Sequence, residues 1–224
     1  MDKLINGGRY GIKLIVFSLV FLVFGKRKPV INLGNKGANW YVPLDLFDQT
    51  SVVYSGGVGE DISFDLELIK KYHCHIHAFD PTPRSIKFAQ KLKKLKHWYF
   101  YPWGIWIENK KIKFYQPKNK NDISASIVNL QKTRRFFYGQ SKTIKKIMKN
   151  LRHEKIDLLK LDIEGAEEMV LLDILQQKIY PKVLCVELHN QLSINKIFHL
   201  ISELRQQHYQ LIKQDHLNFT FLYK

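Results

Sequence analysis

The sequence predicts one α/β domain whose doubly wound, mostly parallel sheet ends in an antiparallel β-hairpin. From residue 51 onward, apolar runs of strand length alternate with amphipathic runs of helix length, which is the pattern of βαβ units. The chain has 224 residues, of which 45% are hydrophobic, and this is enough for one core. At the end of the chain, two strand-like runs are joined by a short polar turn, so we expect them to pair antiparallel.

Each predicted element follows from its local pattern. The runs SVVYS and VLCVE are short and apolar, as buried strands are, while Ile62, Leu66 and Ile69 fall on one face of a helix. The predicted strands are residues 51–55, 76–79, 98–103, 157–162, 183–187, 209–213 and 218–223. The predicted helices are residues 61–72, 85–96, 142–151, 166–177 and 194–207. We also expect a hairpin of residues 105–108 with 111–115 and a loop over residues 117–122.

Two segments precede this domain, which we place at residues 51–224. Residues 1–28 contain an apolar stretch, residues 14–24, that is flanked by basic residues. As a helix it would be about 16 Å long, roughly half the thickness of a hydrocarbon core, so it is too short to span a membrane comfortably. Shallow anchoring at the inner membrane face and docking on the domain both fit this pattern. Residues 29–50, which contain several Gly and Asn residues, are interpreted as a linker.

Positive charge is concentrated in the middle of the chain. The formal net charge is +16, and residues 84–155 alone carry 20 basic and 3 acidic residues. Such a block would attract phosphates, an anionic membrane face or an acidic polysaccharide. Most of the basic residues are Lys rather than Arg, which favours an ordinary solvated surface over the recognition of bases. The charge therefore names no partner by itself, and nucleic acid is disfavoured.

The cysteines and histidines indicate neither a disulfide framework nor a metal site. Cys74 and Cys185 form no CxxC pair, which fits a reducing cytosol. Cys74 lies among His73, His75 and His77, but successive residues of a strand point to opposite faces. No second ligand cluster follows at zinc-site spacing. We therefore interpret this run as the start of a strand, and we expect a cytoplasmic protein.

A glycine loop follows the first predicted strand and opens the first predicted helix. Its residues are Ser55, Gly56, Gly57, Val58 and Gly59. Glycines at such a turn adopt positive φ and let backbone N–H groups approach a bound molecule closely. Asp80 ends the second strand 21 residues after Gly59, near the spacing of about 20 residues at which a carboxylate binds a ribose diol. The combination indicates a ligand that contains adenosine, although an Asp before Pro81 also suits a turn or a helix cap.

Ionisable residues close the fourth and fifth predicted strands. They form two pairs, Asp162 with Glu164 and Glu187 with His189. If extended backbone persists, the members of each pair lean to the same side, at the edge where a doubly wound sheet binds its ligand. Carboxylates and a neutral imidazole there can position a hydroxyl and accept its proton. Helix capping by Glu164 and a loop role for His189 are the structural alternatives.

The chain resembles the FkbM-type methyltransferases in four strings: YSGGVGEDISFD, HAFDPTPRS, IDLLKLDIEGAEEMVL and VELH. The resemblance extends from about residue 52 to the C-terminus, and LKLDIEGAE is its most specific element. It implies the Rossmann-like class I methyltransferase fold and S-adenosyl-L-methionine as the cofactor. It also implies O-methylation of a hydroxyl on a sugar, a glycan or a secondary metabolite.

The resemblance implies roles for individual residues. The implied cofactor contacts are Ser55, Gly56, Gly57, Val58, Gly59, Asp61, Asp80, Pro81, Trp103, Gly104 and Asp162. Within this set the glycine loop would contact the methionine part, Asp80 the ribose, and Trp103 with Gly104 the adenine. The candidate catalytic residues are Asp162, Glu164 and His189.

One departure from the family pattern concerns the amino group of the cofactor. Many members carry an acidic residue just before the glycine loop, where this chain has Tyr54 and Ser55. Recognition of the amino group would then fall to Glu60, Asp61 or Asp162.

Three hypotheses about function follow. The leading one is methyl transfer to a hydroxyl of a small molecule or glycan without a metal, with a divalent cation held by Asp162, Glu164 and Glu187 as the minor variant. The second is an RNA methyltransferase that uses the basic block 84–155, against which the chain has no Asn-Pro-Pro-Tyr-type motif. The third is a non-catalytic binding protein that kept the fold. The sequence indicates neither the acceptor nor the oligomeric state.

Overall fold

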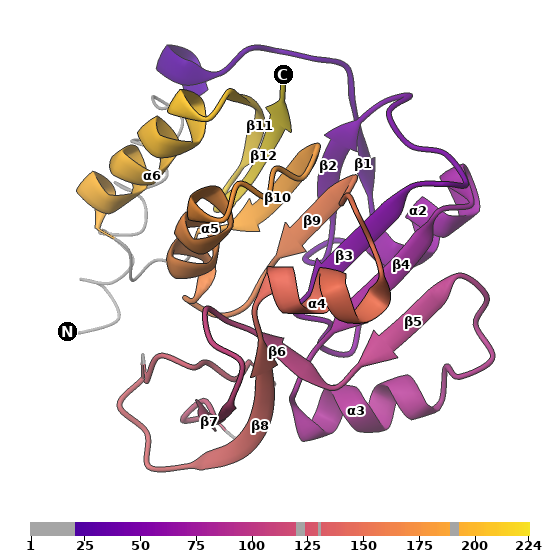
Figure 1. The fold of residues 1–224 in the computed structure, drawn as a ribbon, viewed down its shortest axis with the longest axis vertical. Helices are drawn as coiled ribbons and strands as arrows, with labels where there is room; N and C mark the ends of the chain where they lie inside the picture. The colour runs from indigo at the N-terminus through magenta and orange to yellow at the C-terminus, as the bar shows by residue number, and fades with distance from the viewer. Residues whose placement is uncertain (1–20, 120–123, 130, 189–192) are drawn as a thin grey trace.

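The central sheet of the protein has seven strands. The computed structural model describes residues 21–119, 124–129, 131–188 and 193–224. The order in the sheet is β11-β12-β10-β9-β3-β4-β5, and all neighbours from β10 to β5 run parallel. These strands are β3 (Val52–Gly56), β4 (His75–Phe79), β5 (Trp98–Tyr101), β9 (Leu158–Leu161), β10 (Val183–Glu187), β11 (Tyr209–Asp215) and β12 (Asn218–Tyr223). The closing strands are antiparallel, with β12 between β10 and β11, so the predicted fold class is confirmed (Figure 1).

Helices cover both faces of this sheet. One face carries α2 (Ser63–Tyr72) and α3 (Pro83–Gln90), and the other carries α4 (Ile144–Leu151), α5 (Glu167–Gln176) and α6 (Ile194–Gln206). In Figure 1, α4, α5 and α6 lie in front of the sheet. Successive strand residues alternate between the two sides: Leu158 packs in the cluster with α2, and Leu159 packs in the cluster with α5. The sheet is therefore buried on both faces, as its apolar strands require.

Residues 29–50 differ from the linker that their composition suggested. They contain the strands β1 (Val30–Leu33) and β2 (Trp40–Pro43), which pair antiparallel. Trp40 is 2% exposed and Val42 is fully buried, and both pack in the cluster that contains α2. The Gly- and Asn-rich stretch is the turn of this hairpin, because its glycines Gly34 and Gly37 have positive φ.

A second sheet flanks the main one, with the order β6-β8-β7. Its strands are β6 (Trp103–Ile105), β7 (Lys111–Tyr115) and β8 (Phe136–Lys142). The expected hairpin of residues 105–108 with 111–115 is wrong, because β7 pairs antiparallel with β8, and β6 pairs parallel with β8. Pro102 separates β5 from β6, which leaves the main sheet. The pairing partner β8 lies 20 residues beyond β7, so local pattern did not reveal it.

The end of the N-terminal apolar stretch contacts the domain. Residues 21–24 are helical, and the rings of Phe24 and Phe198 lie 6.1 Å apart in an edge contact. Phe21 also packs against the core, whereas Leu22 and Val23 are 74% and 71% exposed. Residues 14–20 lie outside the described part of the chain. Within the described residues, every helix is too short or too polar to cross a bilayer.

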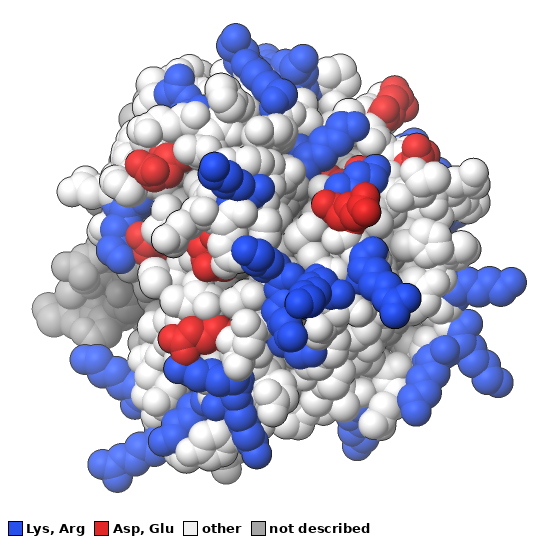
Figure 2. All heavy atoms as spheres, viewed as in Figure 1, with Lys and Arg blue, Asp and Glu red and all other residues white. Residues whose placement is uncertain are grey.

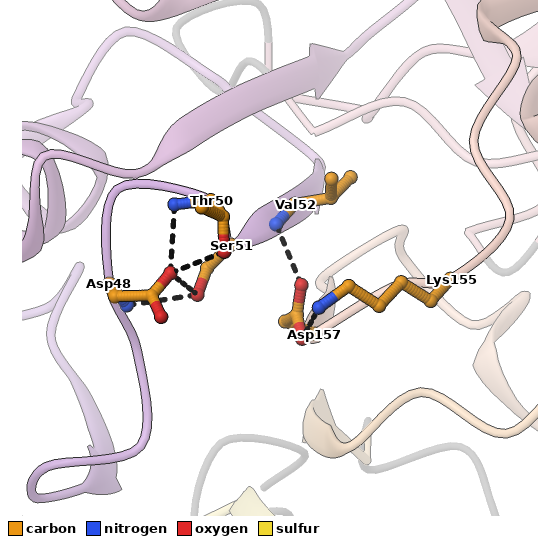
Figure 3. Close-up of polar contacts among 6 residues, drawn as sticks. All are labelled: Asp48, Thr50, Ser51, Val52, Lys155 and Asp157. Atoms are coloured by element: carbon orange, nitrogen blue, oxygen red, sulfur yellow. Dashed lines mark hydrogen bonds and ion pairs between the residues drawn. The ribbon is translucent and has the colours of Figure 1, made fainter.

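Two aspartates organise the amino ends of the central strands (Figure 3). Asp157 accepts a hydrogen bond from Val52 N–H at 2.9 Å and lies 3.1 Å from Lys155 Nζ. Asp48 accepts from the N–H and the hydroxyl of Thr50 at 2.8 and 2.7 Å. These bonds fix the start of β3 at the sheet edge opposite its glycine loop.

The run around Cys74 is the start of β4, as predicted. Cys74 lies in the core on the α2 side, while His77 contacts the ring of Tyr54 on the other face. The described residues hold no group of three or more His, Cys, Asp or Glu that could bind a metal ion.

Candidate functional site

A cavity of about 410 Å³ opens at the carboxyl ends of β3, β4 and β9. Its wall is formed by the glycine loop, the start of α2, the segment after β4 and the turn after β9. The turn of the N-terminal hairpin and Trp40 complete it. The cavity therefore lies where a doubly wound sheet binds ligands, at the point where the chain order reverses beside β3.

The glycine loop passes very close to the turn after β9. Gly57 has a φ of +79°, and a Cβ atom on it would lie 1.7 Å from the carbonyl oxygen of Asp162. No side chain fits there, so glycine is required both for its conformation and for its lack of a Cβ.

The N–H groups of the loop donate to the protein rather than into the cavity. Gly57 N–H bonds to Phe79 O at 3.0 Å, and those of Val58 and Gly59 bond to Asp80 Oδ2 at 3.0 and 3.1 Å. The sequence suggested that these amides face the ligand. In the structure they bond to Phe79 and Asp80 at the end of β4 instead. These bonds fix the conformation of the loop where it lines the cavity.

Asp80 is buried and connects three elements. It is 5% exposed, lines the cavity, and also accepts the N–H of Thr82 at 2.8 Å through Oδ1. The cap of α3 is Thr82, which accepts from Ser85 N–H, so the helix-cap alternative for Asp80 does not hold. A carboxylate has about four acceptor positions, of which these bonds occupy three. The described residues leave one position open, and Asp80 lines the cavity.

The turn after β9 presents Asp162 and Glu164 to the cavity. Extended backbone does not persist between them, because Glu164 has a φ of +59°. Glu167 holds this turn: its carboxylate accepts the N–H of Ile163 at 2.8 Å and of Gly165 at 2.9 Å. Both predicted residues thus line the cavity on a turn that the strand pattern did not predict.

Most of the predicted contacts lie in the cavity wall. The lining residues among them are Ser55, Gly57, Val58, Gly59, Asp61, Asp80, Pro81, Gly104, Asp162 and Glu164. Gly56 and Trp103 are not among the lining residues; the Trp103 ring packs beside Tyr101, and the Lys142 ammonium lies 3.3 Å from its centroid. Glu187 is also outside the lining, and His189 falls outside the described residues.

Two charged lining residues were missed by the reasoning from sequence. Lys160 and Asp65 are 6% and 3% exposed. In the sequence, Lys160 is part of the predicted strand DLLKLD, and Asp65 is part of a predicted amphipathic helix. Both are charged residues at positions that the strand or helix period places in the core, and that combination is the signal that could have identified them.

The cavity wall is strongly acidic. Its carboxylates are Glu60, Asp61, Asp65, Asp80, Asp162 and Glu164. Among the described lining residues, Lys160 is the one cationic side chain. A wall of this charge favours a ligand that is itself mainly cationic.

Several solved structures are similar to this chain. Precorrin-6y C5,15-methyltransferase from Geobacter metallireducens GS-15 has 11% identity and a TM-score of 0.45, covering 81% of this chain and 84% of that one. The fibrillarin pre-rRNA processing protein of Methanococcus jannaschii has 10% identity and a TM-score of 0.47, covering 89% and 85%. Aeropyrum pernix fibrillarin with natively bound S-adenosyl-L-methionine has 8% identity and a TM-score of 0.44, covering 80% and 68%. No curated protein matches the sequence.

A family comparison covers most of the domain. The profile of the methyltransferase FkbM domain matches residues 54–211, which include the glycine loop, Asp80 and the turn after β9. The match spans β3 to β11 and thus nearly the whole of the main sheet. The chain therefore belongs to the FkbM methyltransferase domain family.

Proposed function

We propose that this protein is an S-adenosyl-L-methionine-dependent methyltransferase that methylates a hydroxyl of a sugar, a glycan or a secondary metabolite. The observation that carries the proposal is an acid-rich cavity at the carboxyl ends of β3, β4 and β9 in a member of this family. Its volume lies in the range of about 300–1,000 Å³ that small-molecule sites occupy. S-adenosyl-L-methionine carries a sulfonium and an ammonium group, so an acidic wall complements its charge.

The residues present fit this cofactor. The free acceptor position of Asp80 suits a ribose hydroxyl, because a buried carboxylate forms strong hydrogen bonds with such donors. Gly104 lets the Phe114 ring pack closely against β6, since a Cβ on Gly104 would lie 2.4 Å from Phe114 Cζ, and both residues line the cavity. Asp61 is held at the start of α2, where its Oδ1 accepts Ser63 N–H at 2.8 Å.

The chemistry needs alignment and a proton acceptor. When bound, S-adenosyl-L-methionine supplies an electrophilic methyl group on a sulfonium sulfur. Asp162 and Glu164 stand at the cavity on a turn fixed by Glu167, so either carboxylate can take the proton of an acceptor hydroxyl. His189 stays a sequence-based candidate for the same role. Holding two reactants in line can contribute up to about 7–11 kcal/mol.

The first test is binding. We expect calorimetry to show one site for S-adenosyl-L-methionine and its product S-adenosylhomocysteine, and Asp80→Ala to weaken both at least about 100-fold because a charge-assisted contact and the loop anchor are lost together. Asp48→Ala is the matched control, since Asp48 also accepts a backbone N–H but lies at the opposite sheet edge. Absence of binding to the wild type, or unchanged affinity in a folded Asp80→Ala protein, would contradict the proposal.

The acceptor is identified by methyl transfer. Labelled S-adenosyl-L-methionine is incubated with the protein and with separate pools of glycans, lipids, small hydroxylated metabolites and RNA. Label in a base-stable ether of a glycan or metabolite supports O-methylation. Tight cofactor binding without transfer to any pool supports the non-catalytic alternative.

One observation favours RNA as a second candidate acceptor. Phe136 and Tyr138 on β8 are 43% and 55% exposed, and Lys113 Nζ lies 4.5 Å from the Phe136 ring centroid. Lys and Arg side chains also gather over α4 and along the lower margin of the face in Figure 2. Exposed rings beside lysines can stack bases and neutralise phosphates. The candidate requires retention on RNA at physiological salt with a steep salt dependence, and weak retention rejects it.

A further inference from the structure

A buried lysine and a buried aspartate lie in the cavity wall beneath the glycine loop. Lys160 comes from β9 and Asp65 from the first turn of α2, on the α2 side of the sheet. Neither is used by the proton transfer described above. Burying opposite charges costs more free energy than burying two apolar side chains of similar size, so a purely structural wall gains little from them.

Backbone carbonyl oxygens accept hydrogen bonds from the ammonium group of Lys160. Its Nζ donates to Gly57 O at 2.7 Å and to Gly56 O at 3.3 Å. The carboxylate oxygen Oδ2 of Asp162 lies 3.6 Å away and forms an ion pair with the ammonium. The carbonyl oxygens orient the ammonium, and the Asp162 contact is longer than a direct hydrogen bond. A ligand carboxylate that reaches this end of the cavity would therefore meet a fixed positive charge.

Asp65 is held in the same cluster. Its Oδ2 accepts the indole N–H of Trp98 at 2.9 Å, and its carboxyl also interacts with the Ser55 hydroxyl. Burial raises the pKa of Asp65, and the nearby Lys160 ammonium opposes that rise. The charges of Asp65 and Lys160 thus interact with each other. Lys160 also contacts the glycine loop, which the family resemblance assigns to the methionine part of the cofactor.

We infer that Lys160 binds the α-carboxylate of the cofactor's amino-acid part, between the carboxylates of Asp65 and Asp162 that favour its ammonium group. This rests on the proposed function. The cavity wall carries six carboxylates and one ammonium among its described residues, and the cofactor carries two positive groups and one negative. In this assignment the carboxylates of Asp65 and Asp162 take the recognition of the ammonium group, for which Tyr54 and Ser55 offer no acid.

The test compares two thioethers that differ in the carboxylate. S-adenosylhomocysteine has both the carboxylate and the ammonium, and S-adenosyl-3-thiopropylamine keeps the ammonium but lacks the carboxylate. Titration calorimetry of the wild type with each ligand should show about 10- to 100-fold tighter binding of S-adenosylhomocysteine, the range expected for a charge-assisted contact. This comparison needs no variant, so it holds even if changes at Lys160 disturb folding.

Variants then assign the preference to Lys160. Lys160→Met should lower the affinity for S-adenosylhomocysteine about 10- to 100-fold and change that for the thiopropylamine less than about twofold. Lys160→Arg should restore part of the preference, because it keeps the charge. Lys142→Met is the matched control, since Lys142 lies on β8 outside the cavity lining and should leave both affinities unchanged.

Three results would overturn the assignment. Equal wild-type affinities for the two ligands would show that the carboxylate is not recognised. Equal losses for both ligands in Lys160→Met would assign Lys160 to support of the loop alone. Wild-type protein that binds neither thioether would reject the proposed function and the assignment with it, whereas the first two results would leave the proposed function intact.

Discussion

At the scale of single residues, Gly57 is the position with the least freedom. Its positive φ disfavours other residues, and its close approach to the Asp162 carbonyl excludes any side chain. Gly37 offers a matched comparison, because its φ is +93° but a Cβ there would meet nothing within 4 Å. The pair separates the cost of backbone conformation from the cost of the close approach.

We expect Gly57→Ala to lower the free energy of unfolding by on the order of 3–5 kcal/mol, because two backbone segments must move apart. Gly37→Ala should cost about 1 kcal/mol, which is the conformational part alone. Urea unfolding monitored by circular dichroism measures both. Similar losses in the two variants would mean that the loop can move away from Asp162 without cost.

The chemistry of the site residues was partly predictable from sequence. Asp80 and Asp162 were identified because each follows an apolar strand directly, a signal that local pattern carries. Lys160 was not identified, because its importance depends on the carbonyl of Gly57, 103 residues away. Glu167 was not identified either, although its partners Ile163 and Gly165 are close in sequence. The sequence alone does not distinguish a glutamate that accepts the N–H groups of a turn, as Glu167 does, from a glutamate on a solvent-exposed helix.

At the scale of elements, the register of β3 against β9 positions the glycine loop. At the amino end of this pairing, Asp157 accepts the Val52 N–H (Figure 3). At the end near the loop, Gly56 O accepts the N–H of Asp162 at 3.2 Å. The Val52 N–H thus donates to a side chain, whereas the Val52 carbonyl oxygen accepts the backbone N–H of Asp157 at 2.8 Å. Loss of this contact should loosen the start of β3.

We expect Asp157→Ala to lower the free energy of unfolding by about 1–3 kcal/mol, the cost of leaving a backbone N–H without an acceptor. Asp48→Ala is the control and should cost less than about 1 kcal/mol, because Asp48 is exposed and water can replace it. Hydrogen exchange of the Val52 amide, together with urea unfolding, checks the result. Unchanged protection of that amide in Asp157→Ala would contradict it.

Element prediction succeeded where pattern was local. The strands of residues 183–187 and 218–223 were placed correctly, because they are apolar runs bounded by polar turns. The strand predicted at residues 209–213 extends two residues further, to Asp215. The second sheet was not predicted, since β8 pairs with β6 and β7 across a long insertion. Pairing between distant strands is decided by what they pack against, which periodicity does not encode.

At the scale of the whole molecule, a cluster of rings couples stability to pH. Burial lowers the pKa of His77 to about 3, and the nearby His153 and His75 add to this effect. The His77 and His153 rings lie 4.5 Å apart, and Tyr54 bonds to His153 at 2.9 Å. The folded protein therefore keeps His77 neutral where an unfolded chain would protonate it.

The sign of the effect follows from proton binding. An unfolded His titrates near pH 6.5, so between about pH 6.5 and 3 the unfolded state binds a proton that folded His77 excludes. The free energy of unfolding should fall as pH falls through this window, by at most about 1.4 kcal/mol per pH unit for one group. His77→Gln should flatten this dependence in urea titrations from pH 7 to 4. An equal slope in the variant would exclude His77 as the cause.

The sequence by itself determined the alternation of strands and helices, the antiparallel ending, the glycine loop and the carboxylates after β4 and β9. These are local features, since each is encoded in a few neighbouring residues and their period. Only the tertiary structure decided that residues 29–50 join the core, that the loop amides bond to Asp80, and that Lys160 lies below the loop in an acidic wall. Those outcomes depend on residues from distant parts of the chain, because their burial and their electrostatic interactions exist only once the chain has folded.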